Sequence, residues 1–107
     1  MEVYYFKRDR YEYYSGKLPT RRAFKQDYVK LPYKFTYNKK LSRNQNLERV
    51  FILLNDGADK PNPLSGKGSQ IWLKQHNIGH TSMSIGDIIK VGDHYYIVSE
   101  IGFKRLW

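Results

Sequence analysis

The stretch "GHTSMSIGD", residues 79–87, gathers side chains that can carry out hydrolytic chemistry. His80, Ser82, Ser84 and Asp87 are the residue types of a Ser-His-Asp site. Such a site needs a serine on a sharp turn, and the chain has no G-x-S-x-G segment to supply that turn. His80 and Ser82 also stand too close in sequence to indicate a triad. We therefore expect a polar loop whose side chains bond to nearby backbone groups.

Gly86 and Asp87 fit the backbone requirements of a turn that leads into a strand. Glycine supplies a permissive turn position, and an aspartate carboxylate can accept a hydrogen bond from a nearby backbone N–H. On this interpretation Asp87→Asn should lower stability only mildly, because an amide oxygen can still accept that bond.

His76 and His80 are the candidate metal ligands, because a spacing of four places two residues on one face of a helix. Asn77 and Gly79 disfavour a helix there. The chain has no cysteine, and no acidic cluster lies nearby in sequence, so a metal ion would lack ligands. We expect neither a metal nor a cofactor.

The stretch "SGKGS", residues 65–69, is a candidate phosphate-binding loop. A Walker A loop requires G-x-x-x-x-G-K-[ST]. Pro61 stands where the first glycine is needed, and Gly68 follows Lys67 where the motif requires Ser or Thr. The segment is therefore a basic loop that could touch phosphate only loosely.

Positive charge is concentrated in the first part of the chain. The net charge is +9, and residues 1–45 hold 12 Lys and Arg against four Asp and Glu. Tyrosines are interleaved with these cations, and such a mixture can meet phosphates and stack on bases. The candidate binding residues are Lys7, Arg8, Arg10, Tyr11, Tyr13, Tyr14, Arg21, Arg22 and Lys25. Two partners remain open, a nucleic acid or nucleoprotein and a host protein with an acidic surface.

The elements that would position these residues are those of a small α+β domain. Residues 3–6 and 33–37 have the aromatic content or alternation of strands, and a short helix could begin after Thr20. Residues 45–56 predict an amphipathic helix with a Ser42–Gln45 capping box and Gly57 at its end.

The second half of the chain reads as a long connection followed by β-structure. Residues 57–84 are rich in Pro, Gly and polar residues, and residues 70–75 could form a short strand or one helical turn. Three C-terminal strands are predicted, with Gly92-Asp93 as the hairpin turn between the first two.

One amphipathic helix is therefore expected to pack on a small antiparallel sheet that is either open or barrel-like. Residues 1–107 form a single domain, with a basic, Tyr-rich part (1–45) and a helix followed by β-structure (46–107). The expected core is Val50, Phe51, Leu54, Ile85, Ile89, Val91, Ile97 and Phe103. No signal peptide or membrane span is evident, so we expect a cytoplasmic protein that does not bind membranes.

Residues 47–106 also carry a family pattern. The segment "LERVFILLN" has the form of a short helix ending in F-x-x-x-N, and "HTSMSIGDIIKVGDHYYIVSEIGF" follows h-x-S-x-S-x-G-D-x-I…Y…G-F. The matching positions are Phe51, Asn55, His80, Ser82, Ser84, Gly86, Asp87, Ile89, Tyr96, Gly102 and Phe103. This pattern resembles the YodL-like domain family. The insert that contains "SGKGSQIWLKQ" is longer than in the family's short form, and the basic N-terminal part is not covered by the resemblance.

The resemblance implies a small non-enzymatic accessory protein of a phage, plasmid or other mobile element. It implies a structural role for the motif residues and supplies no catalytic ones. Together with the charge pattern, it predicts a protein that acts by binding.

Overall fold

The computed structural model of the chain describes residues 1–7, 17–55 and 61–107. Along the chain the elements are β1 (Glu2–Phe6), α1 (Arg21–Asp27), β2 (Tyr28–Lys34), α2 (Arg43–Leu53), α3 (Lys67–Gln75), β3 (Ile88–Val91), β4 (His94–Val98) and β5 (Phe103–Arg105). The five strands form one antiparallel sheet in the order β2-β1-β3-β4-β5. The α+β class is confirmed, and the sheet is open, with β2 and β5 at its edges.

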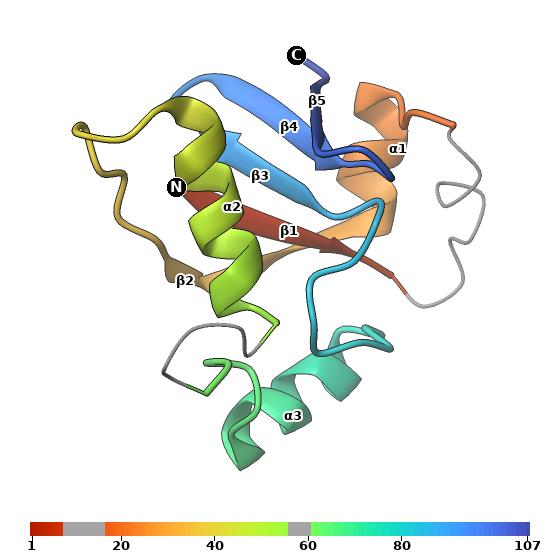
Figure 1. Cartoon of the computed structure of the whole chain (residues 1–107). Helices are drawn as coiled ribbons and strands as arrows, with labels where there is room; N and C mark the ends of the chain where they lie inside the picture. Colours follow the sequence, from red (N-terminus) through yellow and green to blue (C-terminus); the bar gives the residue numbers. More distant parts are fainter. Residues whose placement is uncertain (8–16, 56–60) are drawn as a thin grey trace.

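The helices lie on both sides of this sheet, with α2 in front and α1 behind it in Figure 1. Side chains from one sheet face, among them Val3, Tyr5 and Ile89, form the larger core with residues of α2 and α3. The other face contributes Phe6 and Ile88, among others, to a smaller core that Phe24 of α1 adjoins. A single strand can contribute to both cores, because successive side chains along a strand point to opposite faces of the sheet.

The sequence-based prediction of α2 is confirmed, with its start at Arg43. Ser42 caps the helix by accepting from the Gln45 N–H, and the Gln45 side chain accepts from the Ser42 N–H at 2.9 Å. This reciprocal pair satisfies two donors that a helix start leaves without partners. Leu47, Val50 and Leu54 are buried, whereas Phe51 is only partly buried. Gly57 lies outside the described residues.

The predicted strand at residues 33–37 is wrong in its position. The strand β2 runs from Tyr28 to Lys34, because it pairs with β1 through partners such as Tyr28 and Phe6. Pro32 sits in β2 at the point where the register with β1 shifts. Proline is tolerated at such a place because β2 is an edge strand and the ladder is already interrupted there. The short helix predicted after Thr20 is confirmed as α1, with Thr20 as its cap.

The long connection contains more structure than the sequence indicated. Residues 67–75 form α3, a longer element than the predicted short strand or single helical turn. Leu64, Leu73, Ile78 and Met83 are buried in the larger core. These contacts make residues 61–84 a packed part of the domain.

The C-terminal strands lie where the sequence placed them. Gly92 in the β3–β4 turn has φ +59°, a conformation that favours glycine. Of the predicted core, Val50, Leu54, Ile89 and Ile97 are buried. The others, Phe51, Ile85, Val91 and Phe103, are partly buried and pack against the larger core.

The packing of α2 predicts a contrast between two aliphatic residues on one helix. Leu47→Ala should lower the free energy of unfolding by about 2–5 kcal/mol, because Leu47 is fully buried. Ile52→Ala, a matched control at a position that is 43% exposed, should change it by less than about 1 kcal/mol. Urea unfolding of both variants measures this contrast, and equal losses would show that α2 packs through a different face.

Candidate functional site

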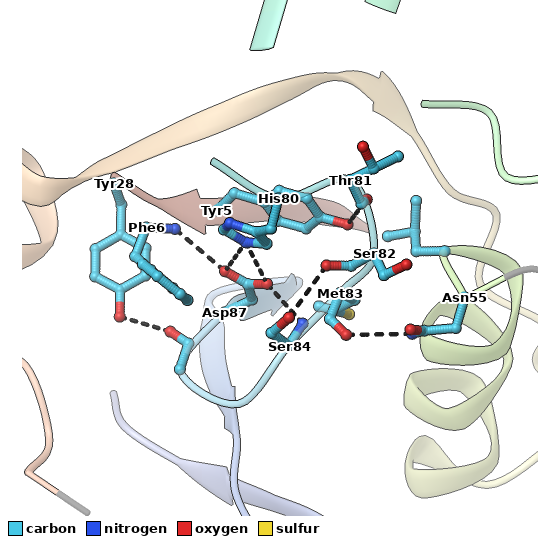
Figure 2. Close-up of polar contacts among 12 residues, drawn as sticks. Tyr5, Phe6, Tyr28, Asn55, His80, Thr81, Ser82, Met83, Ser84 and Asp87 are labelled. Carbon is cyan, nitrogen blue, oxygen red and sulfur yellow. Dashed lines mark hydrogen bonds and ion pairs between the residues drawn. The ribbon is translucent and has the colours of Figure 1, made fainter. Parts of the chain in front are cut away.

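The motif loop that precedes β3 is organised around the imidazole of His80. The ring stacks on Tyr5 and Phe6 at the end of β1, with centroid distances of 4.5 and 4.6 Å and interplanar angles of 18° and 24°. Its Nε2 atom lies 3.0 and 3.1 Å from the two carboxylate oxygens of Asp87. Figure 2 shows the imidazole between the aromatic rings and this carboxylate. His80 is thus fixed by stacking and by an ionisable partner.

Asp87 is fully buried and accepts hydrogen bonds from several donors. The backbone N–H of Ser84 donates to Oδ2 at 2.8 Å, and that of Phe6 donates to Oδ1 at 3.2 Å. Burial raises the pKa of the Asp87 carboxyl, and the bonds from His80, Ser84 and Phe6 oppose that rise. An ionised carboxylate only accepts, so Nε2 of His80 carries a proton in the ionised pair.

Two tyrosine hydroxyls hold the same loop from the sheet. Tyr28 donates to the Gly86 carbonyl at 2.6 Å, and Tyr5 donates to the Thr81 carbonyl at 2.9 Å. Burial raises the pKa of Tyr5, so its hydroxyl stays protonated as a donor. Gly86 has φ +98°, which explains the glycine at this turn. These bonds connect β1 and β2 to a loop far along the chain.

The remaining motif residues also tie elements together. The Asn55 amide donates to the Phe51 carbonyl at 2.7 Å and to the Met83 carbonyl at 3.3 Å, which joins the end of α2 to the motif loop. Phe51 meets Phe103 edge-on at 6.5 Å, and Gly102 has φ +75° in the turn before β5.

The serines do not complete a hydrolytic arrangement with His80. The Ser84 hydroxyl donates to the Ser82 carbonyl at 3.3 Å, and Ser82 is exposed. Among the described residues, Nε2 of His80 bonds to the two carboxylate oxygens of Asp87 instead. His76 stacks on Trp72 at the end of α3, and no group of three or more His, Asp and Glu able to hold a metal ion exists among the described residues.

A second candidate site lies on the sheet face that α1 partly covers. Partners that lie opposite each other on neighbouring strands share a face. The pairing therefore builds one row of Lys30, Tyr4, Ile88, Ile97 and Lys104, and a second row of Lys34, Glu2, Lys90 and Tyr95. We call this surface the aromatic–basic face and include in it the adjoining residues Arg21, Phe24 and Trp107.

The aromatic rings of this face contact one another. Phe24 of α1 packs against Tyr4 and Tyr95 at centroid distances of 4.8 and 5.2 Å, and Trp107 lies 5.6 Å from both Phe24 and Tyr95. Burial is the main cause that raises the pKa of Tyr4 to about 12, and the negative charge of Glu2 is the second. The Tyr4 hydroxyl is therefore neutral at physiological pH. Tyr4 therefore adds no negative charge to the face.

Cations lie over two of these rings and along the strands. Arg21 stands over Trp107 at 5.3 Å and Lys90 over Tyr95 at 5.6 Å. Glu2 is the one acidic residue in the two rows, and it faces Lys30 at 3.3 Å and Lys90 at 3.8 Å. The rows thus carry four lysines against one carboxylate, which leaves an excess of positive charge.

Of the predicted binding residues, the structure brings Arg21 to this face, where it lies over Trp107. Arg21, Arg22 and Lys25 are exposed on α1, and Lys7 donates to the Gln26 carbonyl at 2.9 Å. Arg8, Arg10, Tyr11, Tyr13 and Tyr14 lie outside the described residues.

Sequence reasoning missed the cations and rings that the sheet assembles from distant segments. These are Lys30, Lys34, Lys90, Tyr95, Lys104 and Trp107. Their alternation with apolar residues within short strands was the available signal, but the face appears only once strand order and register are known.

Comparison with known proteins identifies a viral relative. The "Uncharacterized protein R785" of Acanthamoeba polyphaga mimivirus is 34% identical to the chain over 99 residues, a match that covers 88% of the chain and 87% of the viral protein. The chain belongs to the family of this mimivirus protein. With 88% covered, the relationship extends over most of the basic N-terminal part as well as the motif region. No family model matches the chain, and no solved structure matches it.

The environment of Asp87 predicts a larger effect of Asp87→Asn than the sequence suggested. An amide retains one acceptor oxygen, and its NH2 group would face either the Phe6 N–H or the Ser84 N–H. We expect a loss of about 2–4 kcal/mol in the free energy of unfolding. Asp93→Asn, a matched control at an exposed turn, should change it by less than about 0.5 kcal/mol.

Thermal and urea unfolding of the two variants provide the measurement. If Asp87→Asn proved as mild as Asp93→Asn, the carboxylate would not organise the motif loop.

Proposed function

We propose that the protein binds nucleic acid through the aromatic–basic face. The observation that carries this proposal is the combination, on one sheet face, of four lysines, a cluster of aromatic rings and Arg21 of α1. Phosphates attract such cations regardless of base sequence, and aromatic rings offer surfaces to bases.

The arrangement suits binding of low sequence specificity. Lysine is a mobile point charge, so it attracts phosphate without the geometric selectivity of a planar arginine fork. The helix α1 has only seven residues and packs on the sheet through Phe24, so the face presents no long helix for a major groove. The proposed contacts are therefore mainly with the backbone.

The biological setting that we propose is that of a non-enzymatic accessory protein of a virus or mobile element. The mimivirus relative supports a viral setting, and the resemblance of residues 47–106 to YodL-like domains supports an accessory role. Among the described helices, none is long and apolar enough to cross a membrane. An acidic surface on a host protein is the alternative partner, since it would meet the same positive charge.

Salt dependence of binding tests the proposal. Fluorescence anisotropy with labelled oligonucleotides should show log K falling linearly with log[salt]. Replacing Lys30, Lys34 and Lys104 together with Gln should flatten the slope by up to about 2–3 units, because each lost phosphate contact removes roughly 0.7–0.9. The triple replacement should weaken binding to oligonucleotides of every base sequence by the same factor.

The matched control replaces three exposed lysines that are not in the two rows, Lys39, Lys67 and Lys74, with Gln. It removes the same net charge and should change the slope by less than about 1 unit, because only long-range attraction is lost. Equal slopes for the two variants would contradict a localised site. Binding weaker than about 100 μM in low salt would contradict nucleic-acid binding altogether, since non-specific binders reach that strength at physiological salt.

A further inference from the structure

We infer that the ligand of the aromatic–basic face is single-stranded nucleic acid, whose bases stack on Tyr95 and Trp107. This inference rests on the proposed function and names the form of nucleic acid that the face accepts. Both rings are partly exposed and lie 5.6 Å apart at an interplanar angle of 69°. Tyr95 belongs to the second row, where it pairs with Lys90, and Trp107 follows β5 with its carbonyl bonded to the Tyr95 N–H.

The two rings are held in place by the backbone and by their neighbours. The Tyr95 N–H donates to the Trp107 carbonyl at 2.8 Å, and the Leu106 N–H donates to the Tyr95 carbonyl at 2.7 Å. Phe24 packs against both rings, at 5.2 and 5.6 Å. A base that stacks here therefore meets rings whose positions are already fixed, so little side-chain entropy is lost.

Each ring is paired with a long cationic side chain that can move to a phosphate. Arg21 over Trp107 and Lys90 over Tyr95 show that cations reach these ring faces. A base that stacks on one of these ring faces displaces the flexible cationic side chain that lies over it. The displaced cation can then pair with the adjoining phosphate. An exposed cation–π contact is worth only about 0.5–1 kcal/mol, whereas base–aromatic stacking is worth about 1–3 kcal/mol per base.

A duplex cannot use these rings in the same way. Its base faces are covered by neighbouring pairs, and extruding a base costs a few kcal/mol. Three of the four lysines lie on the edge strands, Lys30 and Lys34 on β2 and Lys104 on β5, and Lys90 lies on the central strand β3. The first row is interrupted by Ile88 and Ile97, which are buried in the smaller core. The second row runs from Lys34 to Tyr95 across three inter-strand gaps, about 14 Å, a width that an extended single strand can follow while its bases turn toward the rings.

The test separates bases from phosphates. Anisotropy would compare three labelled probes in low salt: an oligothymidine of about 12 nucleotides, an abasic strand with the same phosphates, and a duplex of the same length. We expect oligothymidine to bind at least about 5-fold more tightly than the abasic strand, the effect of one stacked base, and more tightly than the duplex.

Variants locate the stacking surface. Tyr95→Leu and Trp107→Leu should each weaken oligothymidine binding by about 5-fold or more and leave binding of the abasic strand unchanged. Tyr95→Phe keeps a ring and should retain the affinity of the wild type. Tyr37→Leu, a matched control at an exposed tyrosine outside the face, should have no effect. Thermal melts would verify folding, and the wild-type comparison of probes does not depend on any variant.

The outcomes distinguish this inference from the proposed function. Equal binding of oligothymidine and the abasic strand, or tighter binding of the duplex, would overturn the single-strand inference and leave phosphate binding intact. No binding of any probe would overturn both.

Discussion

A carboxylate that is withdrawn from water must be met by hydrogen-bond donors, and Asp87 is fully buried. The three donors come from two places in the sequence: the Phe6 N–H lies at the end of β1, and the Ser84 N–H and the imidazole of His80 lie in the motif loop. Each donor is available only when β1, the motif loop and the start of β3 stand in their native positions. The burial of one carboxyl group therefore makes the arrangement of these segments specific.

This constraint acts on the centre of the sheet. β1 lies between β2 and β3, and its ladder with β3 reaches Tyr4 and Ile88, next to Asp87. A slip of one residue would turn every side chain of a strand to the opposite face. Such a slip would move Tyr4 into the larger core and Tyr5 out of it. The bonds to Asp87 oppose this, so the composition of the aromatic–basic face depends on a loop that lies outside it.

Local patterns were sufficient to predict the elements whose signals lie close together in sequence. The Ser42–Gln45 cap, the apolar stripe of α2 and the Gly92 turn are of this kind, and all three are confirmed. The position of β2 was not predictable in this way, because pairing with β1 overrides the alternation at residues 33–37. The helix α3 was predicted only as a short strand or one helical turn, because glycine and polar residues lower its local signal, while burial of Leu73 stabilises the full helix.

The candidate sites show the same division. The motif around Asp87 was recognised from sequence, but its stacking partners Tyr5 and Phe6 lie more than 70 residues away. The clustering of charge in residues 1–45 predicted a basic surface in the N-terminal part. Two of the four lysines in the two rows, Lys90 and Lys104, instead come from the C-terminal strands. Sheet order and register bring these residues together, and neither is a local property of the chain.

The edges of the sheet carry a consequence for the behaviour of the protein at high concentration. An open sheet presents unpaired backbone groups on its outer strands, which can template pairing with another molecule. Here β2 contains Pro32 and a register shift, and β5 is only three residues long and carries Lys104 and Arg105. Proline removes a donor, and like charges repel an approaching copy. The lysines proposed to attract phosphate thus also protect the protein against edge-to-edge aggregation, so removing them for a binding experiment would weaken that protection.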